Sequence, residues 1–228
     1  MIQLRGIFLE VANECVRDLN LTVVDGEVFC LLCKHGKIRQ HLFSVLRGFS
    51  TPDRGEIAFS RPAAPGDRNV VAMEALNAGD FDAEATLAAH LRLLCRAFRL
   101  KRETVYENLI QLNVGEEHLR KRLQNAEEES FRKLVLAVQL AIPAANLVIN
   151  DFIRQERKSF EMAFNKLLLR RREWGQAILY LTDDIFYALR IADRVAFIKK
   201  GRLLPREPIL AADLEEMDLM RLYEKFLG

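Results

Sequence analysis

Short, unbroken apolar runs, separated by stretches with helical spacing, constrain the fold of this chain more than any other feature. Val28–Leu32 and Asn146–Ile149 have the length expected of strands that are buried on both faces of a sheet. Two more strands are predicted at Ala177–Leu181 and Val195–Ile198. Helices are predicted around these strands at 41–47, 158–172 and 184–192. Strands that alternate with helices in this way predict an α/β fold with a central, mostly parallel sheet.

The N-terminal part predicts an antiparallel β region. Ile2–Leu9 and Leu19–Val24 are strand candidates, and Asp25-Gly26 after the second is a strong turn signal. Further strands are predicted at 56–59, 69–73 and 202–204. Helical spacing then dominates at 86–98, 102–112 and 130–142. We therefore expect a single domain over 1–228, with a helical subdomain at about 80–140 and a last helix at 212–226.

Composition argues against several classes of protein. The 228 residues carry a net charge of +2, so nucleic acid is not expected as a partner. Four cysteines in a chain of this length fit reduced thiols better than a disulfide-rich secreted domain, and the N-terminus lacks a secretory signal pattern. The longest apolar tract, 134–149, contains Gln139, Pro143 and Asn146 and predicts no membrane span. Work at a membrane would therefore need another subunit.

Two blocks of the sequence resemble a known family. Gly26–Ile57 reads GEVFCLLCKHGKIRQHLFSVLRGFSTPDRGEI and resembles the N-terminal core of ABC-type ATPases, the nucleotide-binding subunits of ABC transporters. Thr182–Leu204 reads TDDIFYALRIADRVAFIKKGRLL and resembles the family's switch segment and the strands after it. The resemblance implies an ABC-type nucleotide-binding domain with a P-loop NTPase-like sheet. It also implies ATP and Mg²⁺ as ligands, and a membrane permease subunit and a homologous nucleotide-binding subunit as partners. The implied location is cytoplasmic, peripheral to the inner face of the membrane.

The family's phosphate-binding loop is strongly altered here. Such loops follow G-x-x-x-x-G-K-[ST], in which backbone N–H groups and the lysine hold phosphate and the hydroxyl binds Mg²⁺. On this sequence the first glycine is Cys33, the second is Ile38, the lysine is Arg39 and the hydroxyl residue is Gln40. We expect a bare structural loop at 33–39; a rearranged anion site that uses Lys37 and Arg39 is the alternative. The candidate nucleotide-binding positions are Gly36, Lys37, Ile38, Arg39, Gln40 and His41.

The catalytic positions that the resemblance implies are altered as well. Where the family has Asp-Glu at a strand end, this chain has Asn150-Asp151, and the switch histidine is Asp183. Asn150 supplies no negative charge to support Mg²⁺, and Asp151 is one methylene shorter than the catalytic glutamate. Asn150, Asp151 and Asp183 are therefore interpreted as vestigial catalytic residues, and no metal site is predicted.

Three other positions of the family pattern also lack the family's residues. The adenine-stacking aromatic is replaced by Glu10 or Val11, with Phe8 expected in the core, and Asn77 is the candidate for the glutamine loop. The signature segment falls at Ala126–Ser130, which reads AEEES. Three carboxylates there would repel a triphosphate, whereas glutamate and serine suit an ordinary helix N-terminus.

In the family, each nucleotide site combines the phosphate loop of one subunit with the signature of the other. Both halves are altered in this chain. We therefore predict a non-catalytic, pseudo-ATPase subunit of an ABC transport complex that binds ATP and Mg²⁺ weakly or not at all. Two alternatives remain: an active ATPase that uses Lys37, Arg39 and Asp151, and a soluble scaffold with the same fold.

Two smaller patterns also have competing interpretations. Cys30-x-x-Cys33 with His35 and His41 offers zinc-ligand residue types, but a second C-x-x-C pair is missing and core thiols are preferred. Arg170–Arg172 is interpreted as a solvated helix end, where basic residues complement the helix dipole.

Overall fold

The computed structural model describes residues 1–11, 14–34, 36–61, 68–74, 76, 78–152, 158–211 and 224. The chain divides into two compact units. The first unit comprises Met1–Ala72, Ala144–Arg154 and Leu169–Gly228, and the second comprises Met73–Pro143 and Gln155–Leu168. The predicted helix at 212–226 lies outside the described residues, apart from position 224.

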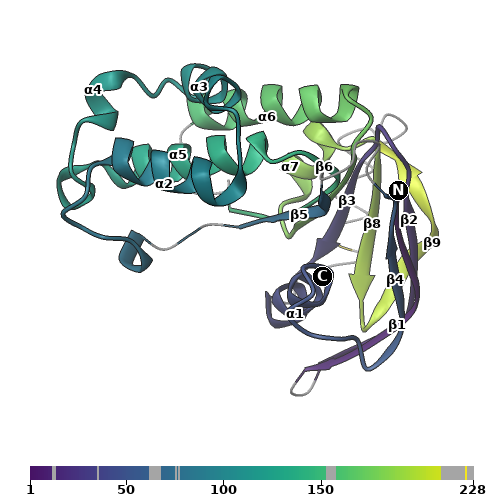
Figure 1. Cartoon of the computed structure of the whole chain (residues 1–228). Helices are drawn as coiled ribbons and strands as arrows, with labels where there is room; N and C mark the ends of the chain where they lie inside the picture. Colours follow the sequence, from purple (N-terminus) through teal and green to yellow (C-terminus); the bar gives the residue numbers. More distant parts are fainter. Residues whose placement is uncertain are drawn as a thin grey trace. The chain divides into compact units, whose positions relative to one another are not determined.

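An antiparallel sheet of the first unit is formed by β1 (Ile2–Val11), β2 (Glu14–Val23) and β4 (Arg54–Phe59), in the order β2-β1-β4 (Figure 1). Alternation along β1 buries Ile2 and Leu4 and, after a register shift, Ile7 and Leu9. Gly55 has φ +91°, and a Cβ there would lie 2.5 Å from Arg5 O. Glycine is therefore required where β4 first approaches β1.

The larger sheet of the described chain has the order β5-β6-β7-β3-β8-β9. β3 pairs in parallel with β7 and β8, β6 pairs in parallel with β7, and β9 is antiparallel to β8. Every residue of β3 and of β7 is buried, as their unbroken apolar runs predict. The expected α/β class, with a mostly parallel sheet and an antiparallel β region, is confirmed. The strand bounds are Val28–Cys33 (β3), Arg68–Met73 (β5), Ala144–Asn150 (β6), Ala177–Thr182 (β7), Arg194–Lys199 (β8) and Arg202–Leu210 (β9).

Helix α1 (Gly36–Leu46) begins inside the segment that was predicted to be a loop. Ile38 is 3% exposed and Leu42 is fully buried, and residues four apart lie on one face of a helix. The bare loop expected at 33–39 is therefore wrong from Gly36 onward, because burying Ile38 in the core favours a helical turn there.

Helix α7 (Ile185–Ile191) belongs to the first unit, whereas α6 (Lys158–Glu173) is divided: its residues up to Leu168 belong to the second unit and those from Leu169 to the first. Gly175 has φ +81° just after α6, in agreement with a glycine C-terminal stop. Asp184 caps α7 by accepting a hydrogen bond from Tyr187 N at 2.9 Å.

A partly buried ion pair joins the two sequence blocks on which the resemblance rests. Glu27 is 4% exposed, and its carboxylate accepts hydrogen bonds from both Nε and Nη2 of Arg194. Arg194 Nη2 also donates to Thr22 O at 2.9 Å, and Asp193 accepts from Val28 N at 2.9 Å. These contacts therefore hold the start of β3 against the start of β8.

The basic run at the end of α6 is not a solvated helix end. Arg171 is 6% exposed, and burial lowers its pKa to about 10. Arg172 forms an ion pair with Asp193 and donates to Gly26 O at 3.4 Å. The interpretation of Arg170–Arg172 as a solvated helix end is therefore wrong, because the last turn of α6 packs against residues at the starts of β3 and β8.

The second unit is mainly helical. In it, α5 (Glu128–Ala141) contacts both α2 (Leu87–Phe98) and α3 (Arg102–Gln111), and Thr86 caps α2. Asn108 is buried and its side-chain amide donates to Ala137 O at 3.0 Å, which links α3 to α5. The short elements of this unit are η1 (Ala78–Asp80), α4 (Glu116–Leu119) and η2 (Leu123–Asn125). Among the described residues, no helix has the length and apolar character needed to cross a membrane.

Candidate functional site

The candidate residues of the first unit gather at the carboxyl ends of neighbouring parallel strands. Cys33 ends β3, Asn150 ends β6, and Asp183 follows β7. Strand register aligns Leu32 with Thr182 and Asn150 with Leu181. The carboxyl edge of an open α/β sheet is where such folds bind ligands, so this edge is the candidate site.

Little chain remains here to form a phosphate-binding loop. Only positions 34 and 35 separate the end of β3 from the start of α1, and His35 lies outside the described residues. Gly36, Lys37 and Gln40 are exposed, His41 is half-buried, and Ile38 points into the core. The first turn of α1 therefore occupies positions that a phosphate-binding loop would use.

Arg39, at the lysine position of the family pattern, contacts a carboxylate of the chain itself. Its Nη1 atom lies 3.3 Å from Asp183 Oδ1, and the two side chains are 18% and 29% exposed. Nε and Nη1 of Arg39 are buried and make no hydrogen bond to a described residue, so this contact is an ion pair without hydrogen-bond geometry. The Asp183 carboxylate therefore neutralises the Arg39 guanidinium, which would otherwise be available to bind an anion at this edge.

Asp151 is held by two hydroxyl groups of β7. Tyr180 donates its hydroxyl proton to Oδ1 at 2.8 Å, and Thr182 donates to Oδ2 at 2.5 Å. Burial, reinforced by Tyr187 and by Asp151 itself, raises the pKa of Tyr180 well above its ordinary value. Tyr180 therefore stays protonated as a donor, and both oxygens of Asp151 are already engaged. Sequence reasoning missed both hydroxyls, because only strand pairing places them beside Asp151.

The donor set fits Mg²⁺ poorly. This ion prefers carboxylate and phosphate oxygens in octahedral geometry. Asn150 is uncharged, and its buried Oδ1 accepts no hydrogen bond from the described part of the chain. No group of three or more His, Cys, Asp or Glu residues that could hold a metal is found among the described residues.

The remaining positions lie apart from this edge or cannot be described. Glu10 is exposed and Val11 is half-buried, and neither offers an aromatic ring. Phe8 is half-buried, with Arg54 5.9 Å from its ring centre, so its expected place in the core is wrong. It lies on the outward face of the alternating strand β1. Asn77 lies outside the described residues.

The signature segment forms a helix N-terminus in the second unit, as its residue types suggest. Helix α5 begins at Glu128 with Glu127 as its N-cap residue. Glu128 pairs with Arg132 at 2.5 Å, and Glu129 pairs with Lys133 at 2.8 Å, both within the helix. Both carboxylates are therefore balanced by basic residues one turn later.

The C-x-x-C pattern does not form a metal site. Cys30 and Cys33 both lie in β3, and residues three apart in a strand point to opposite faces. Their thiols therefore cannot ligate one ion or form a disulfide. All four cysteines are free.

We expect thiol-specific alkylation of the native chain at pH 8 to modify Cys15 first. Cys15 is partly exposed, whereas Cys30, Cys33 and Cys95 are buried. Burial, with smaller contributions from Asp151 and Asp193, raises the pKa of Cys30 well above its ordinary value, so its thiol stays protonated at this pH. Iodoacetamide labelling followed by mass spectrometry measures the order, and labelling in urea provides the control in which all four react. Equal native rates for Cys15 and Cys30 would contradict the buried strand.

Comparison with known proteins agrees with this fold. No family model matches the chain. It is 25% identical over 203 residues to the spermidine/putrescine import ATP-binding protein PotA of Fusobacterium nucleatum, covering 84% of this chain and 52% of PotA. It is 26% identical over 230 residues to PotA of Rubrobacter xylanophilus, covering 93% of this chain and 58% of that protein. The chain therefore spans only about half the length of these relatives.

Solved structures show the same architecture. An ATP-binding subunit of an ABC transporter superposes with a TM-score of 0.78 at 17% identity, with both chains fully covered. A dimeric bacterial ABC transporter cassette superposes with a TM-score of 0.71 at 15% identity, covering 92% of this chain and 99% of that one. In sequence the chain is similar to ABC transporter ATP-binding subunits, and it has the fold of ABC transporter ATP-binding cassettes.

Proposed function

We propose that this chain is a non-hydrolysing, pseudo-ATPase subunit of an ABC transport complex. The observation that carries the proposal is the contact between Arg39 and Asp183 at the candidate site. A nucleotide phosphate at this edge would have to displace the Asp183 carboxylate or lie beside it. The first alternative costs an ion pair, and the second brings like charges together.

The altered loop supports the same proposal. We assign Gly36, Lys37, Ile38, Arg39, Gln40 and His41 as former nucleotide-binding positions. Gln40 lacks the short hydroxyl group that would reach Mg²⁺, and Ile38 is buried in the core. Asn150, Asp151 and Asp183 are assigned as former catalytic positions.

The partners that we propose are a membrane permease subunit and a homologous nucleotide-binding subunit. The relatives carry names of import or export ATP-binding proteins, and one structural neighbour is a dimeric transporter cassette. In such an assembly the chain would lie at the cytoplasmic face of the membrane, peripheral to the bilayer. Even in a dimer with an intact homologue, one shared nucleotide site would lack its phosphate-binding loop and the other would lack its signature segment.

Calorimetric titration with Mg-ATP, with ADP as a control, tests the proposal. We expect no saturable binding tighter than about 1 mM, which corresponds to about −4 kcal/mol. In Asp183→Ala the guanidinium of Arg39 loses its partner, so binding of ATP or ADP should become measurable. The matched control Asp184→Ala removes the neighbouring carboxylate, which caps α7 and does not pair with Arg39. Micromolar binding of Mg-ATP by the unaltered chain would refute the proposal.

An active ATPase with a rearranged loop is the second candidate. Lys37 is exposed on the first turn of α1, where it is free of the core, and Asp151 is oriented by two hydroxyls. This alternative requires Mg-ATP turnover that is lost in both Lys37→Ala and Asp151→Asn. Measurement of released phosphate, with the chain reconstituted with its partner subunits, separates the two candidates.

A further inference from the structure

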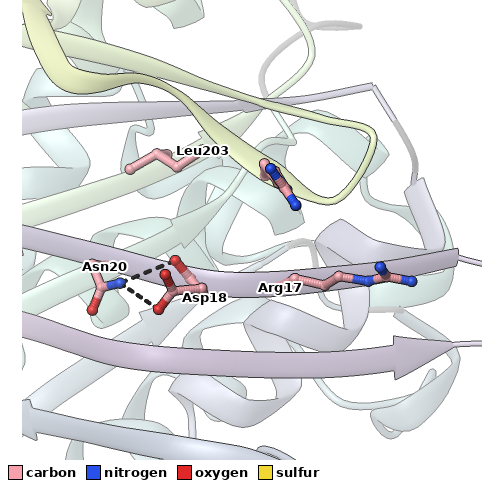
Figure 2. Close-up of a pocket in the computed structure, with 5 residues that line it drawn as sticks. Arg17, Asp18, Asn20 and Leu203 are labelled. Carbon is pink, nitrogen blue, oxygen red and sulfur yellow. Dashed lines mark hydrogen bonds between the residues drawn. The ribbon is translucent and has the colours of Figure 1, made fainter.

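A cavity of about 530 Å³ lies between β2 and β9 of the first unit, apart from the edge that carries Arg39 and Asp183. Arg17, Asp18 and Asn20 of β2 line it, together with Arg202 and Leu203 of β9. Figure 2 shows the three polar side chains of β2 along one strand, with Leu203 on the strand that faces them. This volume is within the range of ordinary small-molecule sites.

A close backbone contact brings the two arginines together. Arg17 N donates to Gly201 O at 2.6 Å, and Arg202 follows directly in the chain. Gly201 has φ +74°, and a Cβ there would collide with Cys15 O. Glycine therefore allows the turn before β9 to touch β2, which places both arginines at the same cavity.

The two guanidinium groups have no anionic partner in the described part of the chain. Arg17 Nε donates to Cys15 Sγ at 3.1 Å, which leaves its two terminal nitrogens available. Arg202 has no ion pair with a described residue. Among the described lining residues, Asp18 is the single carboxylate beside two arginines, so their summed charge is +1.

Asp18 is held in place by its own strand. Asn20 Nδ2 donates to Asp18 Oδ1 at 2.8 Å and to Asp18 O at 3.0 Å (Figure 2). Asn20 Oδ1 accepts from Gly6 N at 2.8 Å. Asp18 has φ +51°, a conformation that costs energy for a residue other than glycine. Its Oδ2 atom accepts no hydrogen bond from a described residue.

We propose that this cavity binds the phosphate monoester of a small hydroxyl-bearing metabolite, such as a sugar phosphate. Two guanidinium groups match the charge and the oxygen geometry of a phosphate dianion. Asp18 Oδ2 is positioned as an acceptor for a hydroxyl of the same ligand, and Leu203 supplies one apolar wall. The site does not depend on the pseudo-ATPase assignment, because it shares no residue with the carboxyl edge of the sheet.

Calorimetric titration of the full chain with ribose 5-phosphate tests this site. We expect saturable binding that weakens about tenfold or more in Arg17→Gln and in Arg202→Gln, because each loses one charge-assisted contact. Arg92→Gln is the matched control, since Arg92 is an exposed arginine of the second unit. No saturation at about 10 mM, or equal affinity in all three variants, overturns the site.

Inorganic phosphate and ribose serve as the partial ligands. Ribose 5-phosphate should bind more tightly than phosphate alone, and Asp18→Asn should reduce that difference because it weakens the hydroxyl acceptor. Equal affinity for the two phosphates overturns the assignment to a phosphate monoester. Circular dichroism of each variant confirms that the fold is kept. Failure of this test leaves the ATP titration unaffected, so the two proposals fail separately.

Discussion

Replacing Ile38 by glycine is expected to lower the free energy of unfolding by about 3 to 5 kcal/mol. Ile38 is 3% exposed and packs into the main core from the first turn of α1. The change removes a buried side chain and adds the cost of glycine within a helix. Urea unfolding followed by circular dichroism measures the loss.

This substitution also separates the two candidate functions. A glycine at this position restores one feature of the phosphate-loop pattern, so a working loop would tolerate it. Gln40→Gly is the matched control, because Gln40 is exposed on the same helix and should cost only about 1 kcal/mol. If Ile38→Gly proved as mild as Gln40→Gly, position 38 would not be part of the core. A helix beginning at Gly36 would then be wrong.

Replacing Arg194 by alanine is expected to destabilise the chain by about 3 to 5 kcal/mol. The change leaves the Glu27 carboxylate, which is only 5% exposed, without its cationic partner. Hydrogen bonding to Glu27 is the largest cause that raises the pKa of Arg194, in agreement with a strong pair. At roughly 2 to 4 °C for each kcal/mol, the midpoint of thermal unfolding should fall by about 10 °C.

Arg5→Ala is the control for this prediction. Arg5 pairs with Glu56 at 3.1 Å, but the two side chains are 60% and 66% exposed. Such a surface pair contributes at most about 1 kcal/mol. Similar losses for the two variants would show that the Glu27–Arg194 pair does not stabilise the contact between β3 and β8.

The Glu27–Arg194 pair also indicates which residues shared with the family pattern stabilise the fold. Gly26-Glu27 and Asp193-Arg194 lie in the two matched blocks, and their side chains and backbone hold β3 against β8. The altered phosphate-loop, strand-end and switch positions lie instead at the carboxyl edge of the sheet. A chain can therefore keep the fold of the family while its ligand-binding edge changes.

The sequence by itself determined the α/β class and the positions of most strands and helices. Runs such as Val28–Leu32 are apolar on both faces, and a buried parallel strand satisfies that pattern. Thr86, Asp184 and Gly175 mark helix ends through local hydrogen bonds and backbone angles, which are readable from residue type.

Contacts between distant residues were decided only by the tertiary structure. The helical start at Gly36 depends on a core that receives Ile38, and the neutralised state of Arg39 depends on Asp183 at the end of another strand. The burial of Arg171 and the presence of both Arg17 and Arg202 at one cavity have the same origin. Local patterns record which face of an element is apolar. Which side chains meet is set by the folding of the sheet, because it brings together segments more than a hundred residues apart.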